Sequence, residues 1–312
     1  PIRTGTSIRR IAKSADGSFE IFAGRKGSGG SAEYNSKNTP PSFRADYVLL
    51  ATGGTRQGYE LATYLGHTIV DPVPSLFTFK ISDNELTALA GVSFPKVVAT
   101  LELEGKRRPG AHLTQEGPLL ITHWGLSGPA ILRLSAWAAR DLFQTNYTGT
   151  LLVDFVPQQK ATEVCAILGT QKQAAQQKRK IGGSPPVDLN IPRRFWLYII
   201  SHKGLNPDDT WGSIPASRLQ EIGHLLKRWP FPVSGKGVFK EEFVTAGGIP
   251  LVEIDLQSME SRKCPNLYFA GEVLDIDGVT GGFNFQNAWT GGFLAGTSIA
   301  KAVAVMLADG EN

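Results

Sequence analysis

The stretch NLYFAGEVLDIDGVTGGFNFQNAWTGGFLAG, residues 266–296, decides how the sequence is interpreted. Residues 266–270 predict a short buried strand that ends at Gly271, and the acidic Glu272 follows at once. Paired glycines within 278–282 then lead into an apolar helix expected over about 284–307. Free N–H groups at such a helix start suit an anion or a developing negative charge, and Glu272 could accept hydrogen bonds from ligand hydroxyls. A surface acid and a glycine-rich cap on a packing helix are the simpler alternatives.

A second strand-to-glycine turn lies near the start of the chain. The sequence FRADYVLLA at 43–51 predicts one buried strand, which ends at Thr52, Gly53 and Gly54 before a helix-like run. Bare backbone at the carboxyl end of such a strand is where α/β folds bind ligands. Many tight strand-to-helix turns look the same, so this motif is weak by itself.

The middle of the chain has a different pattern from its ends. From Pro72 short strand-like pieces alternate with turns, residues 159–230 read as helical with runs at 160–168, 193–201 and 215–229, and strand-like sequence returns after Pro230. We therefore expect an α/β fold in which residues 1–71 and 245–312 form one split domain. A β-rich insertion on the substrate side would comprise 72–158 and 231–244, and 159–230 would form a helical subdomain.

Composition excludes several classes of protein. The formal net charge of +4 fits an anionic ligand without requiring nucleic acid or a membrane. Two cysteines are too few for a disulfide framework, which favours the cytoplasm. We expect no membrane-spanning run, no secretory signal peptide and, from the spacing of the five histidines, no metal site.

Three motifs resemble functional sites and are interpreted as structural. Residues 27–32 match a dinucleotide-binding fingerprint, but the polar, proline-ended sequence that follows predicts a loop instead of the required helix. Ser127 resembles an esterase nucleophile, but Pro129 occupies the position where glycine is needed, so Ser127 is expected to cap the next helix. A basic stretch is expected to be a solvated surface, with RNA contact as the alternative; it comprises Lys172, Lys178, Arg179, Lys180, Arg193 and Arg194.

Taken together, the stretches at 49–69, 123–132 and 244–292 resemble the YhiN/BaiN-like family of NAD(P)/FAD-dependent flavoproteins, also described as aminoacetone-oxidase-like. The resemblance implies a partial Rossmann-like FAD-binding domain, split by a β-barrel-like insertion and a helical subdomain. It implies FAD as the cofactor, NAD(P)H as the electron donor and a small organic substrate. The cofactor-binding positions that it implies are Ile8, Thr52, Gly53, Gly54, Gly271, Glu272, Gly281, Gly282, Phe283, Asn284 and Phe285.

The sequence departs from the family pattern at its start. Family members begin with a further glycine-rich βαβ unit that binds the pyrophosphate of FAD, and residues 1–312 do not contain it. We therefore expect this chain alone to bind FAD weakly or not at all, and a separate FAD-binding segment to restore binding. The hypotheses that follow are an FAD-dependent oxidoreductase or its C-terminal part, a remnant or subunit that binds no flavin alone, and a nucleic-acid-acting flavoprotein. No catalytic acid or base, substrate or oligomeric state can be assigned from the sequence.

Overall fold

The computed structural model describes residues 1–25, 40–103, 113–173, 176–237 and 244–310. The chain divides into two compact units, one formed by Pro1–Val73 with Val244–Asn312 and the other by Pro74–Phe243. Each unit has its own hydrophobic core.

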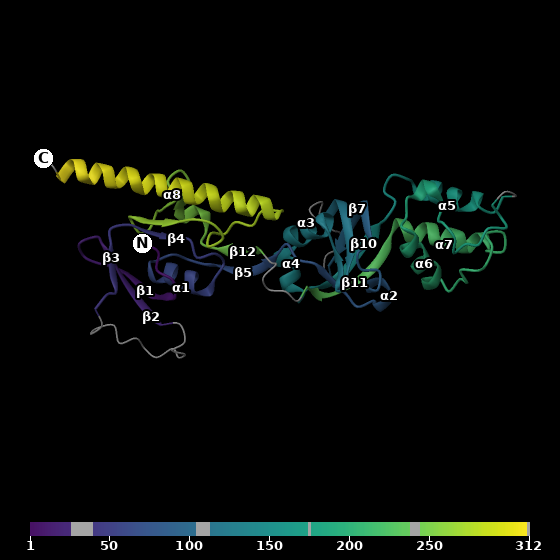
Figure 1. Cartoon of the computed structure of the whole chain (residues 1–312), viewed down its shortest axis with the longest axis horizontal. Helices are drawn as coiled ribbons and strands as arrows, with labels where there is room; N and C mark the ends of the chain where they lie inside the picture. Colours follow the sequence, from purple (N-terminus) through teal and green to yellow (C-terminus); the bar gives the residue numbers. More distant parts are fainter. Residues whose placement is uncertain (26–39, 104–112, 174–175, 238–243, 311–312) are drawn as a thin grey trace. The chain divides into compact units, whose positions relative to one another are not determined.

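The first unit contains two small sheets and a strand pair (Figure 1). One sheet has the antiparallel order β1-β2-β3, and the second has the order β13-β14-β15-β4, in which only β15 and β4 are parallel. Strands β12 and β5 form the separate pair. The strands of this unit are β1 (Thr6–Lys13), β2 (Phe19–Arg25), β3 (Phe43–Ala45), β4 (Val48–Leu50), β5 (Val70–Ser75, which crosses into the second unit), β12 (Val244–Gly248), β13 (Ile254–Asp255), β14 (Glu260–Ser261) and β15 (Leu267–Phe269).

The helices of the first unit are α1 (Arg56–Tyr64), the 3-10 helix η4 (Leu251–Glu253) and α8 (Gly281–Gly310). Helix α8 crosses the end of β15, where Gly291 lies against Ala270 and Ala288 against Gly271. Gly292 and Gly296 of the same helix have no neighbouring atom within 4 Å of an added β-carbon, so they make no close contact of this kind.

Residues 43–51 are not the single strand that the apolar run predicts. The chain breaks at Asp46 and Tyr47, so that β3 pairs with β2 in one sheet while β4 pairs with β15 in the other. A continuous run of β-type sequence does not show where the chain passes from one sheet to another. That position depends on which partner strands lie nearby.

The second unit is built on a closed, antiparallel barrel of six strands in the order β10-β11-β6-β9-β8-β7. These strands are β6 (Phe79–Ile81), β7 (Ser93–Glu102), β8 (Thr114–Thr122), β9 (Gly125–Ser127), β10 (Thr148–Asp154) and β11 (Trp229–Lys236). Gly125 lets β9 approach β6, because a β-carbon there would lie 2.2 Å from the carbonyl oxygen of Phe79.

Helices cover the barrel and form a separate group beside it, with α5, α6 and α7 together (Figure 1). Their bounds are α2 (Asn84–Thr87), α3 (Pro129–Trp137), α4 (Ala139–Gln144), α5 (Ala161–Thr170), η2 (Val187–Leu189), α6 (Arg193–His202) and α7 (Ala216–Lys227). The helical runs expected at 160–168, 193–201 and 215–229 are thereby confirmed. Buried aromatic rings join helices to barrel, since Phe195 contacts both Phe94 and Phe155 at centroid distances of 4.9 and 4.6 Å.

Helix α8 also corrects the expectation of no membrane-length apolar segment. Among the described residues, Gly281–Ala308 is the one helix whose length and apolar composition would suit a membrane span, and 11% of its most apolar window is buried. The core helices of soluble proteins can meet the same criterion of length and composition.

Candidate functional site

The two glycine-ended strands lie side by side. Strands β4 and β15 are parallel, with Leu50 opposite Phe269. The segments that follow them, Thr52–Gly54 and Gly271–Glu272, therefore leave the sheet at the same edge. Gly53 and Gly271 have φ values of +65° and +78°, a conformation that glycine adopts readily and other residues rarely.

A third segment, from β12, joins them at this edge. The backbone N–H of Thr245 donates to Oε1 of Glu272 at 2.6 Å. A β-carbon on Gly54 would lie 2.6 Å from Oγ1 of Thr245 and 3.4 Å from the hydroxyl of Tyr59, so glycine is needed for this close approach. The site thus gathers residues from three parts of the sequence, and we call Gly54, Tyr59, Thr245 and Glu272 the edge cluster.

The phenol of Tyr59 is the unusual member of the edge cluster. Its hydroxyl is buried, and among the described residues it is the one buried side-chain polar atom without a hydrogen-bond partner. Burial, together with the charges of Glu272 and Asp275, raises its pKa to about 12. Tyr59 and Gly54 also line a cavity of about 660 Å³ that extends along α1 to Ile69 and Pro72.

Helix α1 connects the edge cluster to β1, where Ile8 lies. Thr55 caps the helix by accepting from the N–H of Gly58. The side chain of Gln57 donates to the carbonyl oxygen of Ile8, so this carbonyl is engaged by the protein itself. A β-carbon on Gly58 would collide with Oγ1 of Thr52, which shows that Gly58 makes room for the Thr52 side chain.

The start of α8 contains the remaining sequence-predicted positions. The amide of Asn284 closes the preceding loop, because its Oδ1 accepts from the N–H of Gly278 at 2.8 Å and its Nδ2 donates to the carbonyls of Gly278 and Thr280. Phe283 and Phe285 are 62% and 61% exposed. The backbone at Gly281 and Gly282 is open, with nothing closer than 4.0 Å to an added β-carbon. The structure therefore leaves room for a ligand beside these two glycines.

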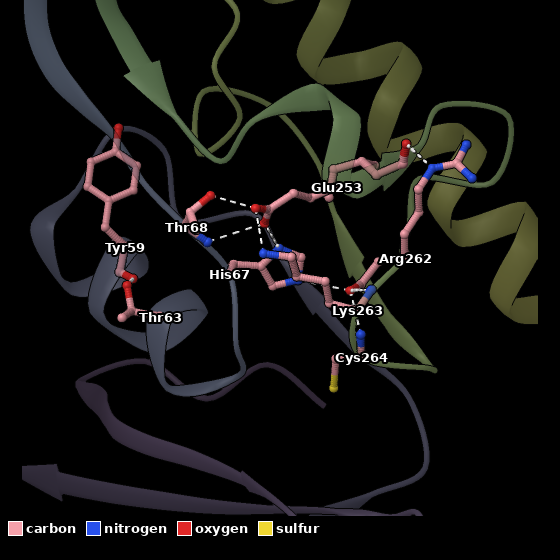
Figure 2. A network of polar contacts seen from close by, with 10 residues as sticks. Tyr59, Thr63, His67, Thr68, Glu253, Arg262, Lys263 and Cys264 are labelled. Atoms are coloured by element: carbon pink, nitrogen blue, oxygen red, sulfur yellow. Dashed lines mark hydrogen bonds and ion pairs between the residues drawn. The ribbon is translucent and has the colours of Figure 1, made fainter.

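A buried polar network that sequence reasoning missed lies beside the C-terminal end of α1 (Figure 2). Nδ1 of His67 lies 2.7 Å from Oε2 of Glu253, and Nε2 lies 2.8 Å from Oγ of Ser261. Thr68 and Lys263 donate to the same carboxylate. No spacing in the sequence could reveal contacts between residues more than 180 positions apart; the only local sign is a histidine next to a glycine after a helix.

The electrostatics of this network favour a neutral histidine and an ionised glutamate. Burial lowers the pKa of His67, and the hydrogen bond and charge of Glu253 offset this only in part. Burial alone would raise the pKa of Glu253, but hydrogen bonds from Lys263, Thr68 and His67 outweigh it and lower the pKa to about 2. His67 therefore donates through Nδ1 to the carboxylate and accepts at Nε2 from Ser261.

Ser261, His67 and Glu253 have the connectivity of an acyl-transfer triad, but the serine is not placed as a nucleophile. Its residue is 7% exposed, and its Oγ accepts from the N–H groups of Lys263 and Cys264 at 3.0 and 2.8 Å. A nucleophile must reach a substrate carbonyl and needs free lone pairs to attack it. We interpret the network as a structural one, whose hydrogen bonds hold the 67–68 and 253–264 segments together.

Ser127 is not a helix cap, contrary to the sequence prediction. It lies in β9 and its Oγ accepts from Oγ1 of Thr78 at 2.9 Å, whereas the residue at the cap of α3 is Gly128, with φ of +95° and no side-chain cap. Pro129 does occupy the first turn, as predicted. The glycine is required because β8 passes so close that a β-carbon would lie 2.9 Å from the N–H nitrogen of Leu120.

Most of the basic stretch contacts the protein itself. Lys172 donates to the carbonyls of Gly212 and Ile214, and Lys180 pairs with Asp208. Arg193 and Arg194 donate to the carbonyls of Gly182 and Ala88. The fingerprint-like residues 27–32 lie outside the described part of the chain. Within that part no three His, Cys, Asp or Glu side chains gather as metal ligands.

Comparison with known proteins gives the family. Residues 73–244 match the family described as the HI0933-like protein barrel and H2TH domain. The chain is 30% identical over 270 residues to a ribosomal RNA dihydrouridine synthase of Haemophilus influenzae, covering 81% of this chain and 60% of that protein. It is 31% identical over 277 residues to a 3-dehydro-bile acid delta(4,6)-reductase of Clostridium scindens, covering 83% and 63%.

A ribosomal RNA dihydrouridine synthase of Escherichia coli is 28% identical over 267 residues, covering 82% of this chain and 61% of that protein. The chain thus spans about three-fifths of the length of these relatives, which are oxidoreductases. The closed six-stranded barrel lies within the matched residues 73–244. The chain belongs to the HI0933-like (YhiN/BaiN) family.

Proposed function

We propose that this chain forms the flavin-side part of an FAD-dependent oxidoreductase that transfers hydride between NAD(P)H, the flavin and an organic substrate. The observation that carries the proposal is the common edge of β4 and β15, where Gly53, Gly54, Gly271 and Glu272 come together. Ligands of α/β folds bind at the carboxyl ends of parallel strands, where side chains and bare backbone converge.

The residues at this edge fit such a cofactor. The glycines allow close approach of the backbone, and Glu272 can accept from ligand hydroxyls. The Tyr59 hydroxyl is a buried donor for which the described residues provide no acceptor. The open backbone at Gly281 and Gly282 starts a long helix, whose N–H groups suit negative charge. When bound, FAD would supply the hydride chemistry, and the protein would orient it and stabilise charge.

The names of the relatives suggest the class of reaction. A dihydrouridine synthase saturates the carbon–carbon double bond of a uracil ring, and a delta(4,6)-reductase of a 3-dehydro-bile acid saturates such bonds in a steroid. In both substrates the double bond is conjugated with a carbonyl group. We propose that this chain takes part in the same reaction, in which a hydride from NAD(P)H and a proton from solvent add across a conjugated double bond.

The reaction class can be tested with the purified chain, excess FAD and NADPH or NADH under anaerobic conditions. The acceptors are a 3-oxo-Δ4,6 bile acid and unmodified ribosomal RNA, and mass spectrometry detects the gain of two hydrogen atoms. We expect one acceptor to be reduced only when FAD is present. Oxidation of NAD(P)H without reduction of either acceptor would contradict the proposed substrate class.

We also propose that a further polypeptide segment supplies the pyrophosphate site. The relatives extend well beyond the matched part of this chain. Strand β4 ends the order of its sheet in the described residues, and α8 exposes Phe283, Phe285, Trp289 and Phe293 by 61–72%. An additional strand and helix could pair with β4 and cover these rings. Co-expression with such a segment should yield a yellow complex after gel filtration.

Ribosomal RNA is the second candidate substrate, favoured by the names of two relatives. The structure gives it little independent support, because most cations of the 172–194 stretch already have acceptors within the protein. Retention of ribosomal RNA that weakens steeply with added salt would favour it. Reduction of the bile acid without salt-dependent RNA binding would exclude RNA as the substrate.

A further inference from the structure

Among the described residues, none accepts a hydrogen bond from the buried Tyr59 hydroxyl. Tyr59 is 7% exposed, and its hydroxyl oxygen is buried without a hydrogen-bond partner in the part of the chain that the structure describes. In Figure 2 the phenol points away from the His67–Glu253 network, and no hydrogen bond reaches its oxygen. A buried donor without an acceptor destabilises a fold, and a bound ligand that accepts from this hydroxyl would remove the cost.

The position of the hydroxyl associates it with the edge cluster. It lies 3.4 Å from where a β-carbon of Gly54 would stand, and the same point is 2.6 Å from Oγ1 of Thr245. Glu272, held by the N–H of Thr245, is close enough for its charge to act on the phenol. With a pKa of about 12, raised by burial and by the charges of Glu272 and Asp275, the phenol stays protonated and can donate at neutral pH.

The combination of a phenol donor and a carboxylate acceptor selects the chemistry of the ligand. A phosphate group would bring negative charge next to Glu272, which is unfavourable. An alcohol can accept from Tyr59 and donate to Glu272 at the same time, and a carboxylate has about four acceptor sites, of which Thr245 uses one. A chain of hydroxyl groups therefore matches this pair better than a phosphate does.

We infer that Tyr59 is a binding residue for the ribityl chain of the flavin, donating a hydrogen bond to a hydroxyl that in turn donates to Glu272. The inference rests on the proposed flavin site and adds a residue to it. Tyr59 thereby distinguishes a flavin with a sugar-alcohol chain from one without it.

The test compares wild-type chain, Tyr59→Phe and the control Tyr47→Phe, whose ring lies in the same unit outside the cavity. Each protein is titrated with riboflavin and with lumiflavin, which carries a methyl group in place of the ribityl chain, and quenching of flavin fluorescence gives the affinity. Neither ligand has a pyrophosphate, so the phosphate site does not affect the result. Thermal unfolding without ligand provides a readout independent of binding.

We expect Tyr59→Phe to bind riboflavin about tenfold more weakly than wild type and to bind lumiflavin equally well. Without ligand, it should unfold about 2–4 °C higher, because the unpaired hydroxyl is gone. Tyr47→Phe should leave both affinities unchanged.

Unchanged riboflavin affinity in Tyr59→Phe, or a lower unfolding temperature without ligand, would overturn the role of Tyr59 while the flavin site stands. Absence of quenching of both flavins by the wild-type chain would instead contradict the proposed flavin site, and the role of Tyr59 with it.

Discussion

His67 and Glu253 are joined by a hydrogen bond of 2.7 Å between Nδ1 and Oε2, although 186 residues separate them in the sequence. Both side chains are buried, and the whole second unit lies between them along the chain. The bond therefore helps to hold the two ends of the split unit together. Its acidic partner, with a pKa of about 2, makes the stability of this unit depend on pH.

Stability should fall as the pH drops below neutrality. His67 has a folded-state pKa below its ordinary 6.5, so its contribution is present above pH 6.5 and declines below it. Glu253 has an ordinary pKa of 4.5 and a folded-state pKa of about 2, so its contribution is lost as the pH falls between these values. We expect this carboxylate to contribute roughly 2–3 kcal/mol at neutral pH.

Urea unfolding between pH 7 and pH 3 measures this dependence. In Glu253→Gln, the free energy of unfolding should fall less between pH 7 and pH 3 than it does in wild type. Glu60→Gln, which alters an exposed ion pair with Arg56, should show the same fall as wild type. An equal loss of unfolding free energy at low pH in Glu253→Gln and wild type would show that the network does not cause the acid sensitivity.

Ser261 should contribute to stability and not to covalent chemistry. Ser261→Ala removes the acceptor of two backbone N–H groups and the partner of His67, and it should cost about 2 kcal/mol. Ser258→Ala, which removes the acceptor of one N–H group, should cost less. Covalent labelling of Ser261 by a fluorophosphonate would be incompatible with this structural role.

Gly128 should matter more than Ser127 at the start of α3. Gly128→Ala forces a β-carbon against β8 at a φ of +95°, and we expect a loss of about 3 kcal/mol or more. Ser127→Ala removes one hydroxyl contact with Thr78 and should cost about 1 kcal/mol or less. Chemical denaturation of the two variants measures the loss of unfolding free energy in each. A larger loss in Ser127→Ala than in Gly128→Ala would support Ser127 as the helix cap.

FAD should bind the 312-residue chain no more tightly than riboflavin does. We propose that the edge cluster contacts the ribityl and ring portions, and we assign the pyrophosphate to a further segment. Fluorescence titration with both ligands measures the difference. If FAD binds ten times more tightly than riboflavin, the pyrophosphate site lies within these 312 residues.

The sequence predicted the elements whose causes are local. The helices at 161–170 and 193–202 follow from apolar spacing, and the strands β4 and β15 follow from short apolar runs that each end near a glycine. The sequence assigned both strands to one split domain, but their pairing was not predicted from it. The change of sheet at Asp46–Tyr47 could not be predicted from the sequence, because it depends on which strands pair with β3 and β4.

Side-chain roles that depend on tertiary contacts could not be predicted from the sequence either. Asn284 was expected at the cofactor, and its amide is bonded to Gly278 and Thr280. Tyr59 and Thr245 have no distinguishing motif, and their importance appears only where the chain folds them against Gly54 and near Glu272.

The central claim, that flavin binds beside the start of α8, is tested most directly by comparing Gly282→Val with Gly292→Val in riboflavin titrations. Both glycines are helical and have open space at the β-carbon, so both substitutions should leave the fold intact. We expect Gly282→Val to abolish binding, because its side chain would occupy the ligand's place, and Gly292→Val to bind as wild type does. Equal binding by both variants, with unchanged circular dichroism, would contradict it.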